Sequence, residues 1–198
     1  MLVLEPVQQV KPSWTTSQIH AWTRLHPSPN WLHYLPVSFR EKIIPWDKLD
    51  AWRAERRARK ERLVVTNGCF DILHVGHVTY LEAARNEGDA LLVGLTSDRW
   101  VRDIKGPGRP VNDENDRAAM LASLESVTAV CVFPDKTALN FLSRVKPEIY
   151  VKGGDYTLDT LVQEERRMLE QAGVKIVLLK HVPGKSTSAL LEKISRLG

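Results

Sequence analysis

Residues 63–77 read LVVTNGCFDILHVGH, and they contain the most informative pattern of the chain. It opens with three apolar residues typical of a buried strand, and a helical pattern follows from about residue 76. Between the two lie Gly68 and the histidines His74 and His77, which flank Gly76. A glycine-containing turn and two imidazoles between a strand and a helix predict a βα unit whose loop faces a ligand.

The same alternation continues along the chain. Short runs rich in Val, Ile and Leu with little polar alternation indicate strands covered on both faces, at 63–67, 90–96, 128–133, 148–152 and 174–179. Helical patterns lie between and after them, at about 76–87, 114–126, 136–144, 158–172 and 187–196. Strands alternating with helices predict an α/β fold with a doubly wound, five-stranded parallel sheet. Ligands of such sheets bind at the carboxyl ends of the strands.

The first 41 residues differ from the rest. They contain five prolines and three tryptophans, and neither a helical nor a strand period persists in them. We therefore expect an N-terminal extension over 1–41 and a single domain over 42–198. Residues 42–62 predict a lead-in helix, with Trp46, Leu49 and Trp52 at helical spacing. The tryptophans of the extension are expected to pack against the domain or a second subunit.

Composition limits the classes of protein that fit. Of the 198 residues, 43% are hydrophobic and 26% charged, as in soluble globular proteins. No apolar run is long enough to span a bilayer and no signal peptide is evident, so we expect a cytoplasmic protein without membrane contact. Residues 53–62 carry six basic and two acidic side chains, and this segment supplies the whole net charge of +4. A solvated helix face explains it, and no nucleic-acid partner is predicted.

Two cysteines, Cys69 and Cys131, supply neither a disulfide framework nor a CxxC metal pair. A nucleophilic role for Cys69 is open, but a small residue beside a tight turn explains it equally well. The histidine pair is a poor zinc site, because no third ligand follows at a suitable local spacing, although Asp71 is near.

The first loop suits phosphate chemistry. A helix N-terminus attracts anions, and Gly68 and Gly76 allow the backbone to approach a bulky ligand closely. Imidazoles at His74 and His77 can donate hydrogen bonds to a phosphate oxygen whose charge grows in a transition state. No nucleophilic side chain is needed, so the pattern favours phosphate transfer by positioning and electrostatics.

Three further loops carry similar groups. KGPGRP (105–110) predicts a mobile flap that brings Lys105 to phosphates, while Arg117 either points back at the site or forms a local ion pair. VKGGDY (151–156) follows a strand, and GKSTS (184–188) precedes the last helix without the earlier glycine of a Walker A loop. Ser186 or Thr187 either caps that helix or joins an anion cradle.

The segments TNGCFDILHVGH, KGPGRPVNDENDR, VKGGDY and GKSTSALL together resemble the cytidylyltransferase-like nucleotidyltransferase superfamily. Within it the chain is most similar to the adenylyltransferase domain of bifunctional heptose kinase/adenylyltransferases, from about Lys42 to the C-terminus. The resemblance implies a Rossmann-like nucleotidyltransferase fold and an ADP-heptose synthase activity. AMP would pass from ATP to a sugar 1-phosphate, foremost D-glycero-D-manno-heptose 1-phosphate, with Mg²⁺ bound mainly through nucleotide phosphates and pyrophosphate released. A homodimer is also implied.

The resemblance also assigns residues. The catalytic groups would be His74, His77 and Lys105. The nucleotide-binding residues would be Thr66, Gly68, Cys69, Phe70, Gly76, Arg117, Lys152, Gly153, Gly154, Asp155, Ser186 and Thr187.

Two other readings stay open. The same chemistry would serve a cytidylyltransferase acting on glycerol 3-phosphate or another phosphorylated alcohol. Alternatively, the chain is a non-catalytic nucleotide-binding module that uses the extension and the basic helix to contact a partner. The histidines favour an enzyme, because a binding module has no need of transition-state donors. Residues 1–41 have no counterpart in the family pattern, and no kinase pattern is present, so another protein would have to make the heptose 1-phosphate.

Overall fold

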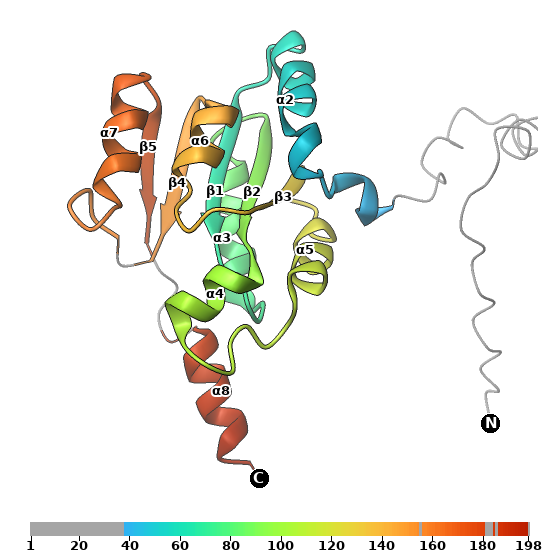
Figure 1. Ribbon diagram of the computed structural model, residues 1–198, viewed down its shortest axis with the longest axis vertical. Coiled ribbons are helices and arrows are strands. Elements are labelled where there is room, and N and C mark those ends of the chain that lie inside the picture. The colour runs from blue at the N-terminus through green and yellow to red at the C-terminus, as the bar shows by residue number, and fades with distance from the viewer. Residues whose placement is uncertain (1–37, 155, 181–183, 185, 198) are drawn as a thin grey trace, which may run out of the picture. The chain divides into compact units, whose positions relative to one another are not determined.

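The computed structural model describes residues 38–154, 156–180, 184 and 186–197 (Figure 1). Its centre is a five-stranded parallel sheet, in which the strands lie in the order β3-β2-β1-β4-β5. The strands are β1 (Leu63–Gly68), β2 (Ala90–Thr96), β3 (Ala129–Phe133), β4 (Ile149–Gly153) and β5 (Lys175–Leu179). The predicted α/β class and parallel sheet are therefore confirmed, and each expected strand lies within one residue of its predicted bounds.

The order of the strands reverses between β1 and β4. From β1 the chain builds outward through β2 to β3, and it then returns to place β4 on the other side of β1. All seven residues of β2 and the first four of β1 are buried, which explains their continuous apolar sequence. The loops after β1 and β4 therefore diverge at the centre of the sheet, where ligands of doubly wound folds bind.

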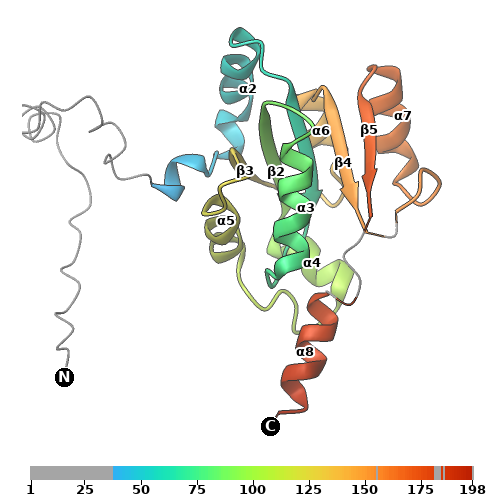
Figure 2. The ribbon, with the colours of Figure 1, turned by 180° about the vertical axis from the view of Figure 1, so that it is seen from behind.

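Helices cover both faces of the sheet. One hydrophobic core contains Leu49 of α2 (Leu49–Ala58), Phe141 of α6 (Leu139–Val145) and Leu169 of α7 (Gln163–Gln171). On the opposite face, Leu81 of α3 (Val75–Arg85) and Leu121 of α5 (Glu114–Ala122) belong to a second core. Figure 1 accordingly shows α6 and α7 in front of the sheet, and Figure 2 shows α3 in front when the view is reversed. The final helix, α8 (Thr187–Ser195), lies beyond the carboxyl ends of the strands (Figure 1).

Two helical expectations need correction. The lead-in helix predicted over 42–62 is only α2, preceded by short 3₁₀ turns at Phe39–Lys42 and Trp46–Lys48. Helix α4 (Asp98–Lys105) was not predicted, and Lys105 ends this helix instead of opening a loop. Its sequence DRWVRDIK carries Trp100, Val101 and Ile104 on one face at helical spacing, so this short amphipathic helix could have been predicted from the sequence.

The basic segment 53–62 is not simply a solvated face. Arg53 is buried, and its guanidinium donates to the carbonyl oxygens of Val145 (2.9 Å) and Lys146 (3.1 Å) and pairs with Glu148. These contacts satisfy carbonyl groups at the C-terminal end of α6, where a cation is favourable. Arg53 thus attaches α2 to the core, and its charge is not available to a partner.

The predicted extension lies almost wholly outside the described residues. The described chain starts at Ser38, and Lys42 Nζ donates to the carbonyl oxygens of Leu124 (3.1 Å) and Val127 (2.9 Å). Ile43 forms a parallel bridge with Val130 of β3. The segment from residue 42 is therefore part of the domain. No described helix has the length and apolarity to cross a membrane.

Candidate active site

The carboxyl ends of the strands open onto a cavity of about 500 Å³. Most residues predicted for the site line it: Gly68, Cys69, Phe70, His74, Gly76, His77, Lys105, Lys152, Gly153, Gly154, Ser186 and Thr187. They come from four loops and the ends of α3, α4 and α8, which the strand order brings to one edge of the sheet. Asp155, also predicted, lies outside the described residues.

The two histidines lie face to face at the start of α3. His74 is the N-cap residue, with an extended backbone (φ −143°, ψ 169°), and His77 lies in the first turn. Their ring centroids are 3.9 Å apart with an interplanar angle of 22°, and the His77 ring meets Phe70 edge-on at 5.3 Å. The i, i+3 spacing of a helix start produces this stacking. Both imidazoles thus line the cavity where backbone N–H groups carry partial positive charge.

A second helix N-terminus reaches the same place. Ser186 is the N-cap of α8 and its hydroxyl accepts a hydrogen bond from the Ala189 N–H at 3.1 Å. Thr187 donates from Oγ1 to the carbonyl oxygen of Ile72 at 3.3 Å, which joins α8 to the loop between β1 and α3. Ser186 therefore caps α8 and also lines the cavity. The N-termini of α3 and α8 both face the cavity.

Lys152 supplies a cation from the end of β4. Its Nζ donates to the carbonyl oxygen of Asn67 at 3.1 Å, which draws the ends of β4 and β1 together. Burial lowers the pKa of Lys152 to about 8, while the negative charge of Glu165 acts in the opposite direction. At neutral pH the ammonium is still mostly charged and can meet a phosphate.

Gly153 is needed for a reason that the sequence did not reveal. A Cβ atom at this position would lie 2.4 Å from Cε2 of Tyr80, so a side chain at residue 153 would collide with the Tyr80 ring. The Tyr80 hydroxyl donates to the carbonyl oxygen of Val151 (3.0 Å) and shares a hydrogen bond with Thr66 Oγ1 (2.6 Å). Thr66 does not line the cavity. It acts through Tyr80, which does.

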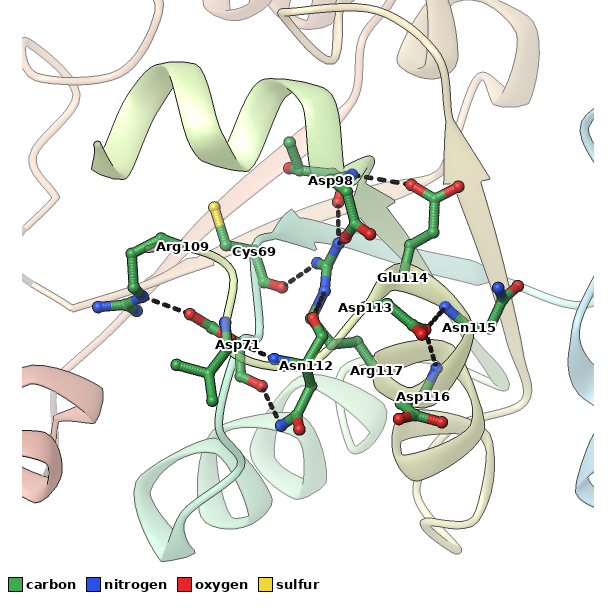
Figure 3. A network of polar contacts seen from close by, with 12 residues as sticks. Cys69, Asp71, Asp98, Arg109, Asn112, Asp113, Glu114, Asn115, Asp116 and Arg117 are labelled. Atoms are coloured by element: carbon green, nitrogen blue, oxygen red, sulfur yellow. Dashed lines mark hydrogen bonds and ion pairs between the residues drawn. The ribbon is translucent and has the colours of Figure 1, made fainter. Parts of the chain in front are cut away.

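The KGPGRP segment (105–110), expected as a mobile flap, is held by Asp71 at Arg109 and at the two residues that follow it, Val111 and Asn112. The buried Asp71 carboxylate pairs with Arg109 and accepts hydrogen bonds from the backbone N–H groups of Val111 (2.7 Å) and Asn112 (3.3 Å) (Figure 3). In return, the Asn112 side chain donates to the carbonyl oxygen of Asp71 at 3.0 Å. Asp71 and Arg109 also line the cavity, so this loop forms a fixed wall of the site.

Arg117 lies behind the cavity and does not line it. Its fully buried guanidinium donates to the carbonyl oxygens of Cys69, Thr96 (2.9 Å) and Asn112 (3.1 Å), and it pairs with Asp98 at 2.6 Å (Figure 3). Of the two alternatives, a contact with the site and an ion pair within DENDR, the described contacts show neither, because Arg117 pairs with Asp98 of α4. Arg117 therefore joins the loops after β1 and β2 to α4 and α5, and it shapes the site from outside.

The sequence analysis missed several residues of the cavity wall. The segment PDKT (134–137) directly follows β3, and its Lys136 and Thr137 line the cavity as residues of the other post-strand loops do. Because ligands bind at the carboxyl ends of parallel strands, the place of this loop after a strand could have identified it from the sequence. Tyr80 of α3 and Glu165 of α7 carried none, because each lies inside a helix whose inward face depends on packing.

Comparison with known proteins places these features in a family. The bifunctional protein HldE of Methylobacillus flagellatus is 47% identical over 155 residues, which cover 78% of this chain and 31% of that protein. HldE of Pseudomonas putida strain GB-1 is 49% identical over 142 residues, covering 72% of this chain and 30% of the relative. The chain thus matches about a third of the length of these curated relatives.

A solved structure and a family model agree with these matches. The lipopolysaccharide core biosynthesis protein from Thermoplasma volcanium superposes with a TM-score of 0.52 and 27% identity, covering 62% of this chain and 97% of that one. The cytidylyltransferase-like family model matches residues 65–193, which span β1 to α8 and every loop of the cavity. With the paired histidines at the start of α3, these findings confirm the resemblance, and the chain belongs to the cytidylyltransferase-like family of nucleotidyltransferases.

Proposed function

We propose that the protein is an adenylyltransferase that transfers AMP from ATP to a sugar 1-phosphate, foremost D-glycero-D-manno-heptose 1-phosphate. The observation that carries the proposal is the stacked pair of His74 and His77, which lies in one cavity with the N-termini of α3 and α8. The matches to HldE proteins support the adenylyl branch over the cytidylyl branch. The KGGDY segment, by its resemblance to heptose adenylyltransferases, supports the choice of acceptor.

The reaction needs one in-line displacement. An oxygen of the sugar phosphate attacks the α-phosphorus of ATP, and the bond from that phosphorus to the bridging oxygen of the β-phosphate breaks. That oxygen leaves with its electron pair on pyrophosphate. His74 and His77 donate hydrogen bonds to the α-phosphate oxygens as negative charge grows on them. No covalent enzyme intermediate forms, so Cys69 has no nucleophilic role.

The remaining groups position the reactants. Ser186 and Thr187, at the N-terminus of α8, hold the outer phosphates, and Lys105 approaches them from the end of α4. Lys152, near the end of β4, reaches across to β1 with its ammonium group and meets the phosphate of the acceptor. Holding both reactants in line converts a bimolecular step into an intramolecular one.

Mg²⁺ is the proposed cofactor, bound mainly through the phosphate oxygens of ATP. Mg²⁺ prefers oxygen ligands and keeps several waters, so one or two phosphates suffice to bring it into a site. A cavity lined by imidazole, ammonium and hydroxyl groups fits phosphates that carry the ion. When bound, Mg²⁺ would neutralise charge on the departing pyrophosphate. By resemblance to the family, we also propose a homodimer that works in the cytoplasm.

The test is pyrophosphate release, with ATP and CTP each offered heptose 1-phosphate, mannose 1-phosphate and glycerol 3-phosphate. We expect release with ATP and heptose 1-phosphate, abolished when Mg²⁺ is chelated. Release only with CTP and glycerol 3-phosphate would contradict the proposed substrates and still agree with nucleotidyl transfer by in-line displacement. If no pair reacts while ATP still binds, the enzyme assignment fails in favour of a nucleotide-binding module.

A further inference from the structure

The cavity extends over both faces of the sheet edge. On the α3 side it is lined by the histidines and by the start of α8, which suit phosphates. On the opposite side, the wall comes from the end of β3, the start of α6 and the first turn of α7, and its residues include Phe133, Thr137, Ala138, Leu161 and Glu165. The proposed function assigns no nucleotide phosphate to this second half of the cavity.

Glu165 is the unusual residue of that second half. Its side chain comes from the first turn of α7, and the residue is only 4% exposed although it lines the cavity. One carboxylate oxygen, Oε1, accepts a hydrogen bond from the Ala138 N–H at 2.8 Å, at the start of α6. Burial raises the pKa of Glu165, while the charge of Lys152 and hydrogen bonding to the Ala138 N–H and the Tyr150 side chain lower it. Burying a carboxylate costs free energy unless the group is hydrogen-bonded or paired with a cation. The Ala138 N–H and the charge of Lys152 provide this compensation for Glu165.

The charge of Glu165 decides what it can bind. A carboxylate repels phosphate groups, and Lys136, a cation of the same wall, is paired with Asp103, so the surroundings of Glu165 are unsuited to the triphosphate. An ionised carboxylate accepts hydrogen bonds at about four lone-pair positions, so with the Ala138 N–H and the Tyr150 side chain as neighbours some positions stay open to a ligand. Sugar hydroxyls are donors of the matching kind, and hydrogen bonds to a charged acceptor are the strong ones.

Lys152 would orient the acceptor between the histidine side and the Glu165 side of the cavity. Its Nζ lies on the carbonyl oxygen of Asn67, and Asn67 is fixed in turn by the Tyr150 hydroxyl, which donates to Asn67 Oδ1 at 2.7 Å. The phosphate of an acceptor held by Lys152 would face the histidines. The hydroxyl-bearing carbons of the same acceptor would extend toward Glu165.

We infer that Glu165 is a specificity-determining residue that accepts hydrogen bonds from the hydroxyl groups of the acceptor sugar. The inference rests on the proposed function and deepens it. It predicts that the enzyme selects acceptors by their hydroxyls, because a site built to bind a hydroxyl strongly rejects an analogue that lacks it.

The test compares Glu165→Gln with wild type in steady-state kinetics of pyrophosphate release. Glutamine keeps the size and an oxygen for the Ala138 N–H, so α6 stays capped while the charge is lost. We expect the KM for heptose 1-phosphate to rise about 10- to 100-fold, with the KM for ATP changed less than about twofold. The matched control is Glu164→Gln, an exposed neighbour on the same helix, which should behave as wild type.

Deoxy analogues of the acceptor separate recognition from a structural effect. Wild type should discriminate against an acceptor lacking the contacted hydroxyl, and Glu165→Gln should lose most of that discrimination. If Glu165→Gln keeps the full discrimination and the normal KM, the inference is wrong while the proposed function stands. If wild type releases no pyrophosphate with any sugar phosphate, the proposed function fails and the inference falls with it.

Discussion

At the scale of single residues, His77 offers a direct separation of binding from chemistry. We expect His77→Ala to lower kcat about 10²- to 10³-fold, because it removes a donor that acts mainly in the transition state. The affinity for ATP should stay within a few-fold, since helix N-termini and lysines bind the ground-state phosphates. Steady-state kinetics and a direct ATP binding measurement check both parts.

The control for His77 is Val78→Ala, the next residue of α3, which is 41% exposed and not part of the cavity wall. It should leave both kcat and ATP affinity unchanged. A His77→Ala variant with wild-type turnover would remove this histidine from the mechanism.

Lys152 predicts a pH dependence. Its lowered pKa of about 8 means that the ammonium is charged below that pH and loses its proton above it. We expect kcat/KM for the acceptor to fall as pH rises through about 8, because a neutral amine no longer attracts the acceptor phosphate. At saturating acceptor the fall should move to higher pH, since a bound phosphate favours the charged form.

Substitution assigns this titration to Lys152. Lys152→Arg keeps the charge at all accessible pH values and should abolish the fall near pH 8. The sign for stability is opposite to that for activity. The unfolded state binds this proton more tightly, so Lys152 makes the free energy of unfolding increase with pH between about 8 and 10.5. A fall near pH 8 that survives in Lys152→Arg would belong to another group.

At the scale of elements, Tyr80 connects α3 to two strands. Its hydroxyl bonds to Thr66 of β1 and to Val151 of β4. Tyr80→Phe keeps the ring and removes both hydrogen bonds, so we expect a loss of about 1–3 kcal/mol in the free energy of unfolding. Urea unfolding measures it. The control is Tyr156→Phe, because Tyr156 is 46% exposed and its hydroxyl should contribute little. Equal effects of the two changes would contradict the assigned role of Tyr80.

Arg117 is the corresponding connection between loops. Arg117→Met leaves the carbonyl oxygens of Cys69, Thr96 and Asn112 without their donor and Asp98 without its ion pair. We expect a loss of about 3 kcal/mol or more in the free energy of unfolding, measured by urea denaturation. Arg167→Met, at an exposed position of α7, should cost less than about 0.5 kcal/mol.

The same variant tests the role that family resemblance gave to Arg117. A nucleotide-binding Arg117 would lose ATP affinity with little change in stability, whereas a buried connection loses stability first. A stable Arg117→Met protein with weakened ATP binding would therefore contradict the interpretation from the structure.

For the molecule as a whole, ligand binding and stability should be coupled through the cavity that joins the loops. A ligand present at about 100 times its Kd stabilises the folded state by about 2.7 kcal/mol. We therefore expect Mg²⁺–ATP to raise the Tm by several degrees in thermal denaturation. Mg²⁺ alone should leave the Tm unchanged, because the proposed ligands of the ion are phosphate oxygens. A rise with Mg²⁺ alone would indicate a metal site on the protein itself.

The parallel sheet and most of the cavity wall could be predicted from local sequence patterns. Buried parallel strands need continuous apolar runs, and loops after such strands must meet at one edge, so LVVTNG and VKGG could be placed without coordinates. Local patterns also located the stacked histidines, because their spacing and the following helix lie within one segment.

The roles of residues that depend on partners far away in the sequence became clear from the tertiary contacts alone. Family resemblance assigned Arg117 to the nucleotide, whereas its four partners, Cys69, Thr96, Asp98 and Asn112, hold it behind the cavity. Gly153 is required by the ring of Tyr80, and Glu165 reaches the cavity only because α7 packs beside α6. Burial and pairing across the chain set these roles, and neither leaves a local trace in the sequence.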